Sequence, residues 1–186
     1  MTRWVFALLA ATLGVPGCTS TSTGSPLPND PTGTEQTLSS PATSVGDAAA
    51  DLAAIDPCTL LTQAQLDQFG LHKRDSGDLA GARQCTWGRA VDRNGKGGFV
   101  VGPAIWDNQG LKDINTDGQI VTDVMTVGKH QARQAKQING NACFVAIGVT
   151  DSSRVDVVVA GSPDESCKLA NEFAKLIEPQ LPGGSG

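Results

Sequence analysis

The sequence predicts an α+β domain in which an antiparallel meander sheet of about six strands packs against an N-terminal and a C-terminal helix. Short apolar runs typical of strands alternate with turns rich in glycine, asparagine and aspartate over residues 83–159. Helix-capping signals stand on either side of this region, near Thr62 and Ser162. A central block of strands flanked by two helices is typical of an α+β sandwich.

The first 17 residues have the pattern of an export signal. Arg3 supplies a positive charge, and residues 4–13 form a nearly unbroken apolar run. This run is shorter than the roughly 20 residues that a membrane-spanning helix needs. Residues 15–18 read Val-Pro-Gly-Cys, which is similar to the lipobox of bacterial lipoproteins. We therefore expect lipidation of Cys18 and cleavage before it, with an ordinary signal peptide as the alternative.

Residues 18–49 are expected to form the lipidated cysteine and a disordered tether. Residues 19–47 are rich in Ser, Thr, Pro and Gly and contain no Lys, Arg, Cys or aromatic residue. Such a composition buries too little apolar surface to offset the entropy lost on ordering. The folded domain is therefore predicted over residues 50–182, with a flexible tail at 183–186.

The first helix is predicted from its capping residues. Asp56 followed by proline suits the start of a helical turn. Thr62 and Gln65 form a capping box, so a helix is expected over Gln63–Phe69. Gly70 can end this helix in the left-handed conformation.

The strands follow a polar loop that contains His72. Residues 83–87 alternate, so Cys85 and Trp87 are expected to share an inward face. The last strand places three valines on one face and its charged residues, Arg154 and Asp156, on the other. The six strands are expected at residues 83–87, 99–106, 120–127, 130–137, 143–149 and 154–159.

The closing helix is predicted to begin at Ser162. Residues 162–165 have the pattern of a capping box with proline at the first helical position. Pro179 marks its end. The apolar stripe has the spacing that lets a helix cover a sheet and consists of Ala170, Phe173, Ala174 and Ile177.

Five cysteines are an odd number for an exported chain. Lipidation of Cys18 leaves four, which can form two disulfides in an oxidising compartment. The remaining four are Cys58, Cys85, Cys143 and Cys167. Three pairings are possible, but the register of the last hairpin places Cys143 near the helix that carries Cys167. This favours Cys143 with Cys167, and therefore Cys58 with Cys85.

One segment has a weak resemblance to a calcium loop. Asp113, Asn115 and Asp117 occupy the first three ligand positions, and Gly118 follows them. The twelfth position should supply a bidentate carboxylate but is Val124. A surface turn prefers the same residue types, so we expect a plain loop, no bound metal and no cofactor.

The sequence contains no recognisable catalytic motif, so the domain is predicted not to be an enzyme. His72 in a loop and His130 at the start of a strand are both interpreted as surface histidines. Trp106 ends a strand beside two polar residues, and we expect it to be partly exposed and available for ligand contact. A formal net charge of −5 without a basic stripe excludes a nucleic-acid binder.

Taken together, these residues resemble an uncharacterised family of actinobacterial lipoproteins, the domain of unknown function 3558. The resemblance rests on Asp56-Pro57-Cys58, Leu60-Leu61-Thr62, Cys85-x-Trp87, Val127-Gly128 with Ala132, Cys143 and Cys167-x-Leu169-Ala170. It covers about residues 50–181 and implies no catalytic or binding residues. By looser analogy, the order helix, sheet, helix resembles the PsbP-like sandwich of photosystem-associated and nuclear-transport accessory proteins.

The sequence thus predicts a lipoprotein anchored to the extracytoplasmic face of the cell membrane. Its domain is expected to bind an unknown envelope protein or small ligand without catalysis. An envelope hydrolase with a dispersed site and a calcium-dependent structural or adhesion module are the two alternatives. Membrane association is expected through the anchor alone, because an acidic surface is not attracted to anionic lipid.

Overall fold

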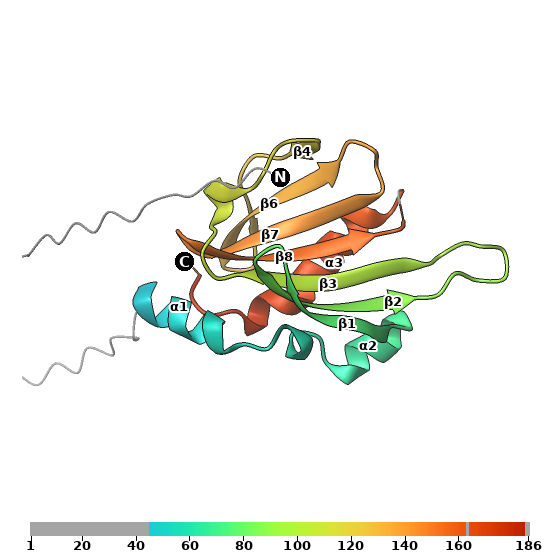
Figure 1. The fold of residues 1–186 in the computed structure, drawn as a ribbon, viewed down its shortest axis with the longest axis horizontal. Coiled ribbons are helices and arrows are strands. Elements are labelled where there is room, and N and C mark those ends of the chain that lie inside the picture. The colour runs from blue at the N-terminus through green and yellow to red at the C-terminus, as the bar shows by residue number, and fades with distance from the viewer. Residues whose placement is uncertain (1–44, 163, 185–186) are drawn as a thin grey trace, which may run out of the picture. The chain divides into compact units, whose positions relative to one another are not determined.

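A computed structural model of the protein describes residues 45–162 and 164–184. The predicted signal peptide, Cys18, most of the tether and the end of the tail lie outside these residues. The described chain forms an eight-stranded antiparallel sheet with three α-helices (Figure 1). This confirms the predicted α+β fold.

The elements follow one another with short connections, and η denotes a short 3₁₀ helix. In chain order they are α1 (Val45–Ala54), η1 (Pro57–Thr59), α2 (Gln63–Phe69), β1 (His72–Leu79), β2 (Ala82–Arg89), β3 (Phe99–Trp106), η2 (Leu111–Asp113), β4 (Gln119–Val121), β5 (Met125–Val127), β6 (His130–Gln137), β7 (Ala142–Thr150), β8 (Ser153–Ala160), α3 (Ser166–Ile177) and η3 (Glu178–Gln180).

The strand order of the sheet is β1-β2-β3-β8-β7-β6-β4, and β5 also pairs with β6. Each of the two runs β1-β2-β3 and β6-β7-β8 is a meander of the kind predicted. The runs join through the pairing of β3 with β8, so the sheet departs from a single meander at this point. As a result, the last strand of the chain lies in the middle of the sheet.

The strand predictions missed one strand and merged two others. The segment from His72 to Leu79 was expected to be a loop but forms β1, which pairs with β2 at the edge of the sheet. All its residues are exposed, so the sequence shows no apolar alternation there. The single strand expected over residues 120–127 is split into β4 and β5, which pair with successive parts of β6.

The helices also differ from the prediction at two places. Helix α1 begins at Val45, five residues before the predicted start of the domain, and it buries Ala48 and Leu52. Helix α3 begins at Ser166 rather than at Ser162, because the carbonyl of Ser162 accepts from the N–H groups of residues 165 and 166 in a preceding turn. Helix α2 has the predicted capping box and a left-handed Gly70 at its end.

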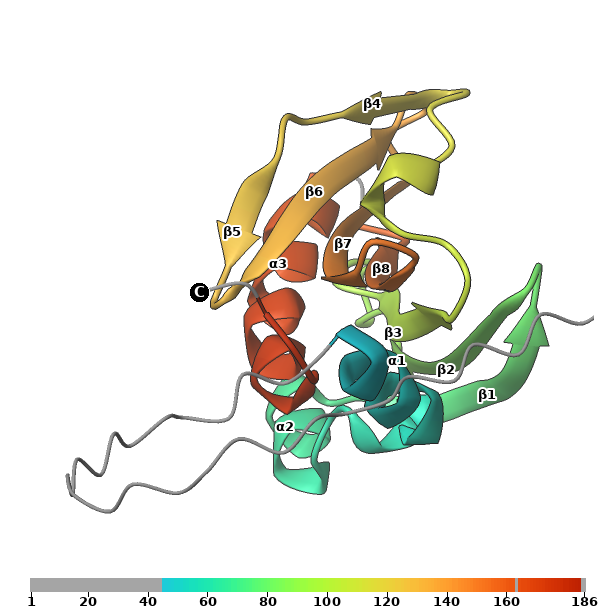
Figure 2. The same cartoon turned by 90° about the vertical axis from the view of Figure 1, so that its left-hand side faces the viewer.

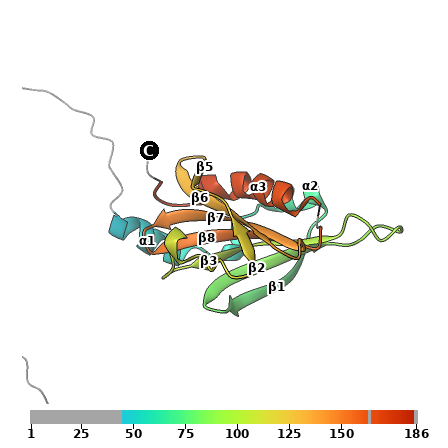
Figure 3. The ribbon, with the colours of Figure 1, turned by 90° about the horizontal axis from the view of Figure 1, so that it is seen from above.

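All three helices cover the same face of the sheet (Figures 2 and 3). The predicted stripe of α3 is fully buried there. Its Phe173 ring packs against Phe69 of α2 at 4.6 Å and Phe99 of β3 at 6.2 Å between centroids. The main core therefore lies between the helices and this face.

Two disulfides link the helical layer to the sheet. Cys58 of η1 pairs with Cys85 of β2, and Cys143 of β7 pairs with Cys167 of α3. The Cα atoms of the pairs are 5.1 and 5.0 Å apart. The pairing is the one that the hairpin register favoured.

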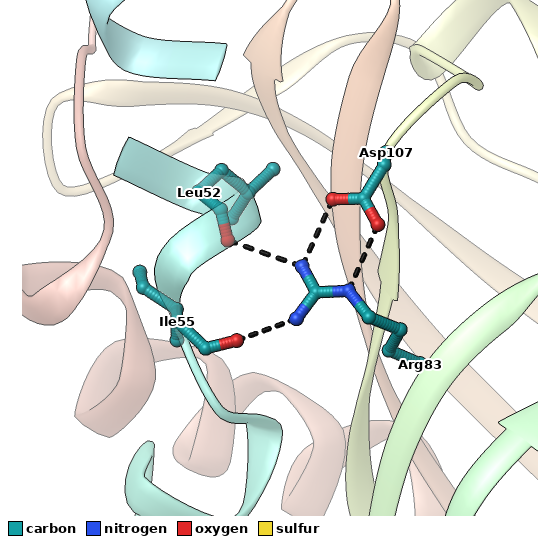
Figure 4. Close-up of polar contacts among 4 residues, drawn as sticks. All are labelled: Leu52, Ile55, Arg83 and Asp107. Atoms are coloured by element: carbon teal, nitrogen blue, oxygen red, sulfur yellow. Dashed lines mark hydrogen bonds and ion pairs between the residues drawn. The ribbon is translucent and has the colours of Figure 1, made fainter. Parts of the chain in front are cut away.

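The Arg83 side chain fixes the end of α1 against the sheet (Figure 4). Its guanidinium donates to both carboxylate oxygens of Asp107, at 2.8 and 2.9 Å. It also donates to the carbonyl oxygens of Leu52 and Ile55, at 3.1 and 2.5 Å. These carbonyls lie at the C-terminal end of α1, where a cation is favourable, and the Leu52 carbonyl also accepts from the Ile55 N–H at 3.1 Å. The hydrogen bonds and charge of Asp107 raise the pKa of Arg83.

Replacing Arg83 should loosen α1. Arg83→Ala removes the guanidinium that donates to the two carbonyls and to Asp107, and we expect the free energy of unfolding to fall by about 1–3 kcal/mol. Arg83→Lys keeps the charge but not the planar fork, so it should recover only part of the loss. Urea denaturation measures the effect. Arg93→Ala, at an exposed arginine in the β2–β3 turn, is the control; an equal loss there would contradict the assignment.

Candidate functional site

The face of the sheet opposite the helices carries a pocket of about 390 Å³. Its floor is made by residues of β2, β3, β7 and β8: Ala82, Gln84, Thr86, Val100, Gly102, Ala104, Phe144, Val158 and Ala160. The end of the β1–β2 hairpin forms one wall through Leu79 and Ala80. The segment between β3 and β4 forms the other wall through Gln109, Asp113, Ile114 and Asn115, together with Gln119 at the start of β4. Figure 2 shows these two segments beyond the sheet on the side away from the helices.

Strand alternation explains why the floor is apolar. In β8, Val155, Val157 and Val159 belong to the main core, so Val158 and Ala160 face the pocket. Gly102 lies between β2 and β8, and a side chain there would collide with the carbonyl of Cys85. The absence of a side chain at Gly102 therefore permits the close approach of the β2 backbone.

One end of the pocket is polar and contains a buried ion pair. The Arg154 guanidinium donates to both carboxylate oxygens of Asp156, at 2.9 and 3.3 Å. Its central carbon also lies over the Trp106 ring, 4.9 Å from the ring centroid. The two charged residues are only 4% and 6% exposed. The sequence correctly placed Arg154 and Asp156 on the face of β8 opposite its valines, but it did not predict that this face is also buried.

The Asp156 carboxylate is held in a strongly desolvated position. Burial raises the pKa of Asp156, while the hydrogen bonds and charge of Arg154 and the nearby Trp106 indole act in the opposite direction. The indole nitrogen itself makes no direct hydrogen bond within the described residues. The carboxylate therefore depends mainly on Arg154 for compensation.

The wall between β3 and β4 is attached by two contacts, and a further hydrogen bond lies within it. Arg154 donates its third hydrogen bond to the Gly110 carbonyl at 3.0 Å. Gly110 also lies so close to Asp151 that a side chain would collide with the Asp151 carbonyl. Asp113 accepts from the Gly110 N–H at 2.8 Å and so caps η2. The position of this wall thus depends on a residue of the central strand.

The weak calcium candidates belong to this wall. Asp113 and Asn115 line the pocket, and all three candidates are exposed. Asp113 caps η2 and Asn115 accepts from the Asp117 N–H at 2.9 Å, so local hydrogen bonds account for both side chains. Within residues 45–162 and 164–184, no group of three or more His, Cys, Asp or Glu side chains is placed to hold a metal ion.

Of the other residues singled out from the sequence, one lies in the pocket and the two histidines differ in burial. Trp106, the expected ligand contact, lines the pocket. His72 is exposed at the start of β1, as expected of a surface histidine. His130 is instead fully buried, which corrects the surface assignment. Sequence reasoning missed Arg154 and Asp156; the signal was a charged pair inside an apolar strand.

His130 is buried because the end of the chain folds back over the start of β6. Its Nδ1 lies 2.7 Å from a Glu178 carboxylate oxygen, and its Nε2 lies 3.0 Å from the Pro182 carbonyl oxygen. Glu178 also accepts from the Lys129 N–H. Burial raises the pKa of Glu178, but the hydrogen bonds of His130 and Lys129 outweigh it, so the pKa lies below its usual value. This cluster attaches the C-terminal segment and lies outside the pocket lining.

The fold and the pocket define a disulfide-stabilised α+β domain with a small, mainly apolar pocket on its sheet. The chain matches the family described as "Protein of unknown function (DUF3558)" over residues 13–180, and it belongs to this family. Neither a curated protein nor a solved structure matches it. The likeness to the PsbP-like sandwich therefore stays a prediction.

The buried pair allows a test of how the site is held. Arg154→Met leaves the Asp156 carboxylate buried without its partner, so the free energy of unfolding should fall by about 3–5 kcal/mol. A second variant that adds Asp156→Leu removes both charges and should be closer to the parent protein in stability. Urea denaturation compares the two. A double variant less stable than Arg154→Met would contradict the role given to the pair.

Proposed function

We propose that the protein is a lipid-anchored binding protein of the cell envelope and that its pocket holds a small apolar ligand without transforming it. The observation that carries this proposal is the pocket of about 390 Å³ on the open face of the sheet. Its volume falls in the range of small-molecule sites, which are mainly apolar with a few placed polar groups. Val100, Phe144 and Val158 supply the apolar floor, and Trp106 lies at the polar end.

The chemistry of the lining supports binding rather than catalysis. Nucleophilic catalysis needs a nucleophile within reach of a base. The charged residues of the lining are Asp113, Arg154 and Asp156, and the last two are engaged with each other. The ion pair therefore has no free base to offer, and within the described chain the lining places no histidine or cysteine beside the remaining carboxylate, Asp113.

Anchoring through Cys18 is supported by the cysteine count. The other four cysteines pair with one another, which leaves Cys18 as the residue of the lipobox-like sequence. The family match extends over this position. The part of the chain that the structure describes contains no helix long and apolar enough to cross a membrane.

Replacing Cys18 should separate the protein from the membrane. Lipid anchors stabilise membrane association by about 0.8 kcal/mol per buried methylene, so several acyl chains hold a protein firmly. In a host that processes lipoproteins, we expect the wild-type chain in the membrane fraction and Cys18→Ser in the soluble fraction or unprocessed. Intact-mass analysis provides the second readout. An unmodified Cys18 on the mature wild-type protein would exclude the anchor.

Filling the floor of the pocket should abolish ligand binding. Val158 lies opposite Gly102 and Phe144 in the neighbouring strands, so Val158→Phe places a ring in the middle of the floor. We expect the uncharged probe N-phenyl-1-naphthylamine to fluoresce on binding to the parent chain and to lose at least about tenfold in affinity for the variant, since the cavity that it occupies is filled. The chain carries Cys18→Ser, so that acyl chains do not compete for the probe.

The matched control is Val124→Phe. Val124 is 59% exposed in the connection between β4 and β5, so the same substitution there adds apolar surface without filling the pocket. The control should bind the probe as the parent does. Failure of the parent to bind, or equal binding by Val158→Phe, would exclude the pocket as the site.

A further inference from the structure

If the pocket binds a small ligand, as proposed above, the charged residues of its lining determine which charge the ligand can carry. Arg154 is the cation of the lining, and it is already committed. It donates to both oxygens of Asp156 and to the Gly110 carbonyl, and its plane is covered by Trp106. A carboxylate or phosphate entering the pocket would therefore compete with Asp156 for a partner that is buried and saturated on three of its donors.

The third charged residue of the lining is Asp113. Its side chain is exposed on the wall, and it forms no ion pair with any residue that the structure describes. The lining therefore has one excess negative charge, because Arg154 and Asp156 cancel each other. An anionic head group would meet this charge, whereas an uncharged one would not.

The remaining polar groups of the lining are uncharged hydrogen-bonding groups. Gln109 and Asn115 stand in the wall that carries Asp113, and Gln84 and Thr86 lie in the floor. Amides and hydroxyls can donate and accept, so they suit a head group that does the same. Two buried atoms of the lining lack a partner within the described chain, the Gln119 Oε1 acceptor and the Trp106 Nε1 donor.

From this arrangement we infer that the pocket selects an uncharged amphiphile, with a hydrocarbon chain over the floor and a hydroxyl-bearing head group beside Asp113 and the wall amides. A monoacylglycerol represents this class, whereas the fatty acid of the same chain length has the wrong charge. The apolar part of the ligand follows from the proposed function. The head-group preference is the new element. Asp113 and the committed Arg154 disfavour an anion. The amides and the hydroxyl of the lining both donate and accept, which suits a hydroxyl head group better than an ammonium that only donates.

The experiment measures displacement of N-phenyl-1-naphthylamine by monodecanoylglycerol, decanoate and decylammonium, below the concentrations at which each forms micelles. We expect monodecanoylglycerol to displace the probe at a concentration at least about fivefold lower than decanoate. Two like charges a few ångströms apart in a solvated site account for an effect of this size. Decylammonium carries the opposite charge and tests whether the site prefers a cation.

Two charge variants assign the effect to its residue. Asp113→Asn removes the charge, and its amide oxygen can still accept from the Gly110 N–H, so affinity for decanoate should rise about fivefold. Asp117→Asn changes the net charge equally in the same segment, but its side chain is outside the pocket lining. We expect the ratio between the two decanoyl ligands to fall only in Asp113→Asn.

The outcomes separate this inference from the proposed function. If the probe does not bind the parent chain, the pocket is not a ligand site and both fail. If the probe binds and decanoate or decylammonium displaces it best, the head-group inference is wrong and the binding function stands. Equal ratios in Asp113→Asn and Asp117→Asn would also overturn it, because the preference would then come from overall charge.

Discussion

The pairing of β8 with both β3 and β7 is the constraint on which the rest of the structure depends. It places the last strand of the chain in the middle of the sheet, where one face meets the helices and the other meets the pocket. The valines of β8 suit the first face. On the second face, Arg154 and Asp156 are acceptable only because each satisfies the other, and the Gly110 bond of Arg154 then sets the wall of the pocket. A single topological choice thus connects the core, the ion pair and the candidate site.

The two faces of the sheet are held by different kinds of interaction. The helical face has a continuous apolar core and two disulfides that tie η1 and α3 to strands. Its edges are fastened by polar clusters, Arg83 at the end of α1 and the pair of His130 and Glu178 at the C-terminal segment. The pocket face has no helix over it, and its walls are a hairpin end and a connecting segment. Most of the apolar core and both disulfides therefore lie on the side away from the pocket.

Much of the fold could be predicted from the sequence because the helical face imposes clear periodicity. The cap of α2, the bounds of β3 and β6, and the buried stripe of α3 all follow from local patterns and agree with the structure. The predictions failed where burial is set by distant parts of the chain. Strand β1 is exposed on both faces and so has no pattern, while His130 is polar yet buried by residues almost 50 positions away. Trp106 was found from its place at a strand end, but a pocket formed by four strands and two connections has no local signal.

The presence of a buried ion pair where an apolar pair could stand favours a role in placing the wall of the pocket over a role in stability. Replacing such a pair by apolar residues is often neutral or stabilising, so stability alone does not explain Arg154 and Asp156. An apolar pair could not hold the Gly110 carbonyl, and it could not fix the Trp106 ring by a cation over its face. Both contacts determine where the wall and the indole stand relative to the floor. The charge pair therefore has the character of a positioning device, which turns one apolar sheet surface into a pocket with a defined polar end.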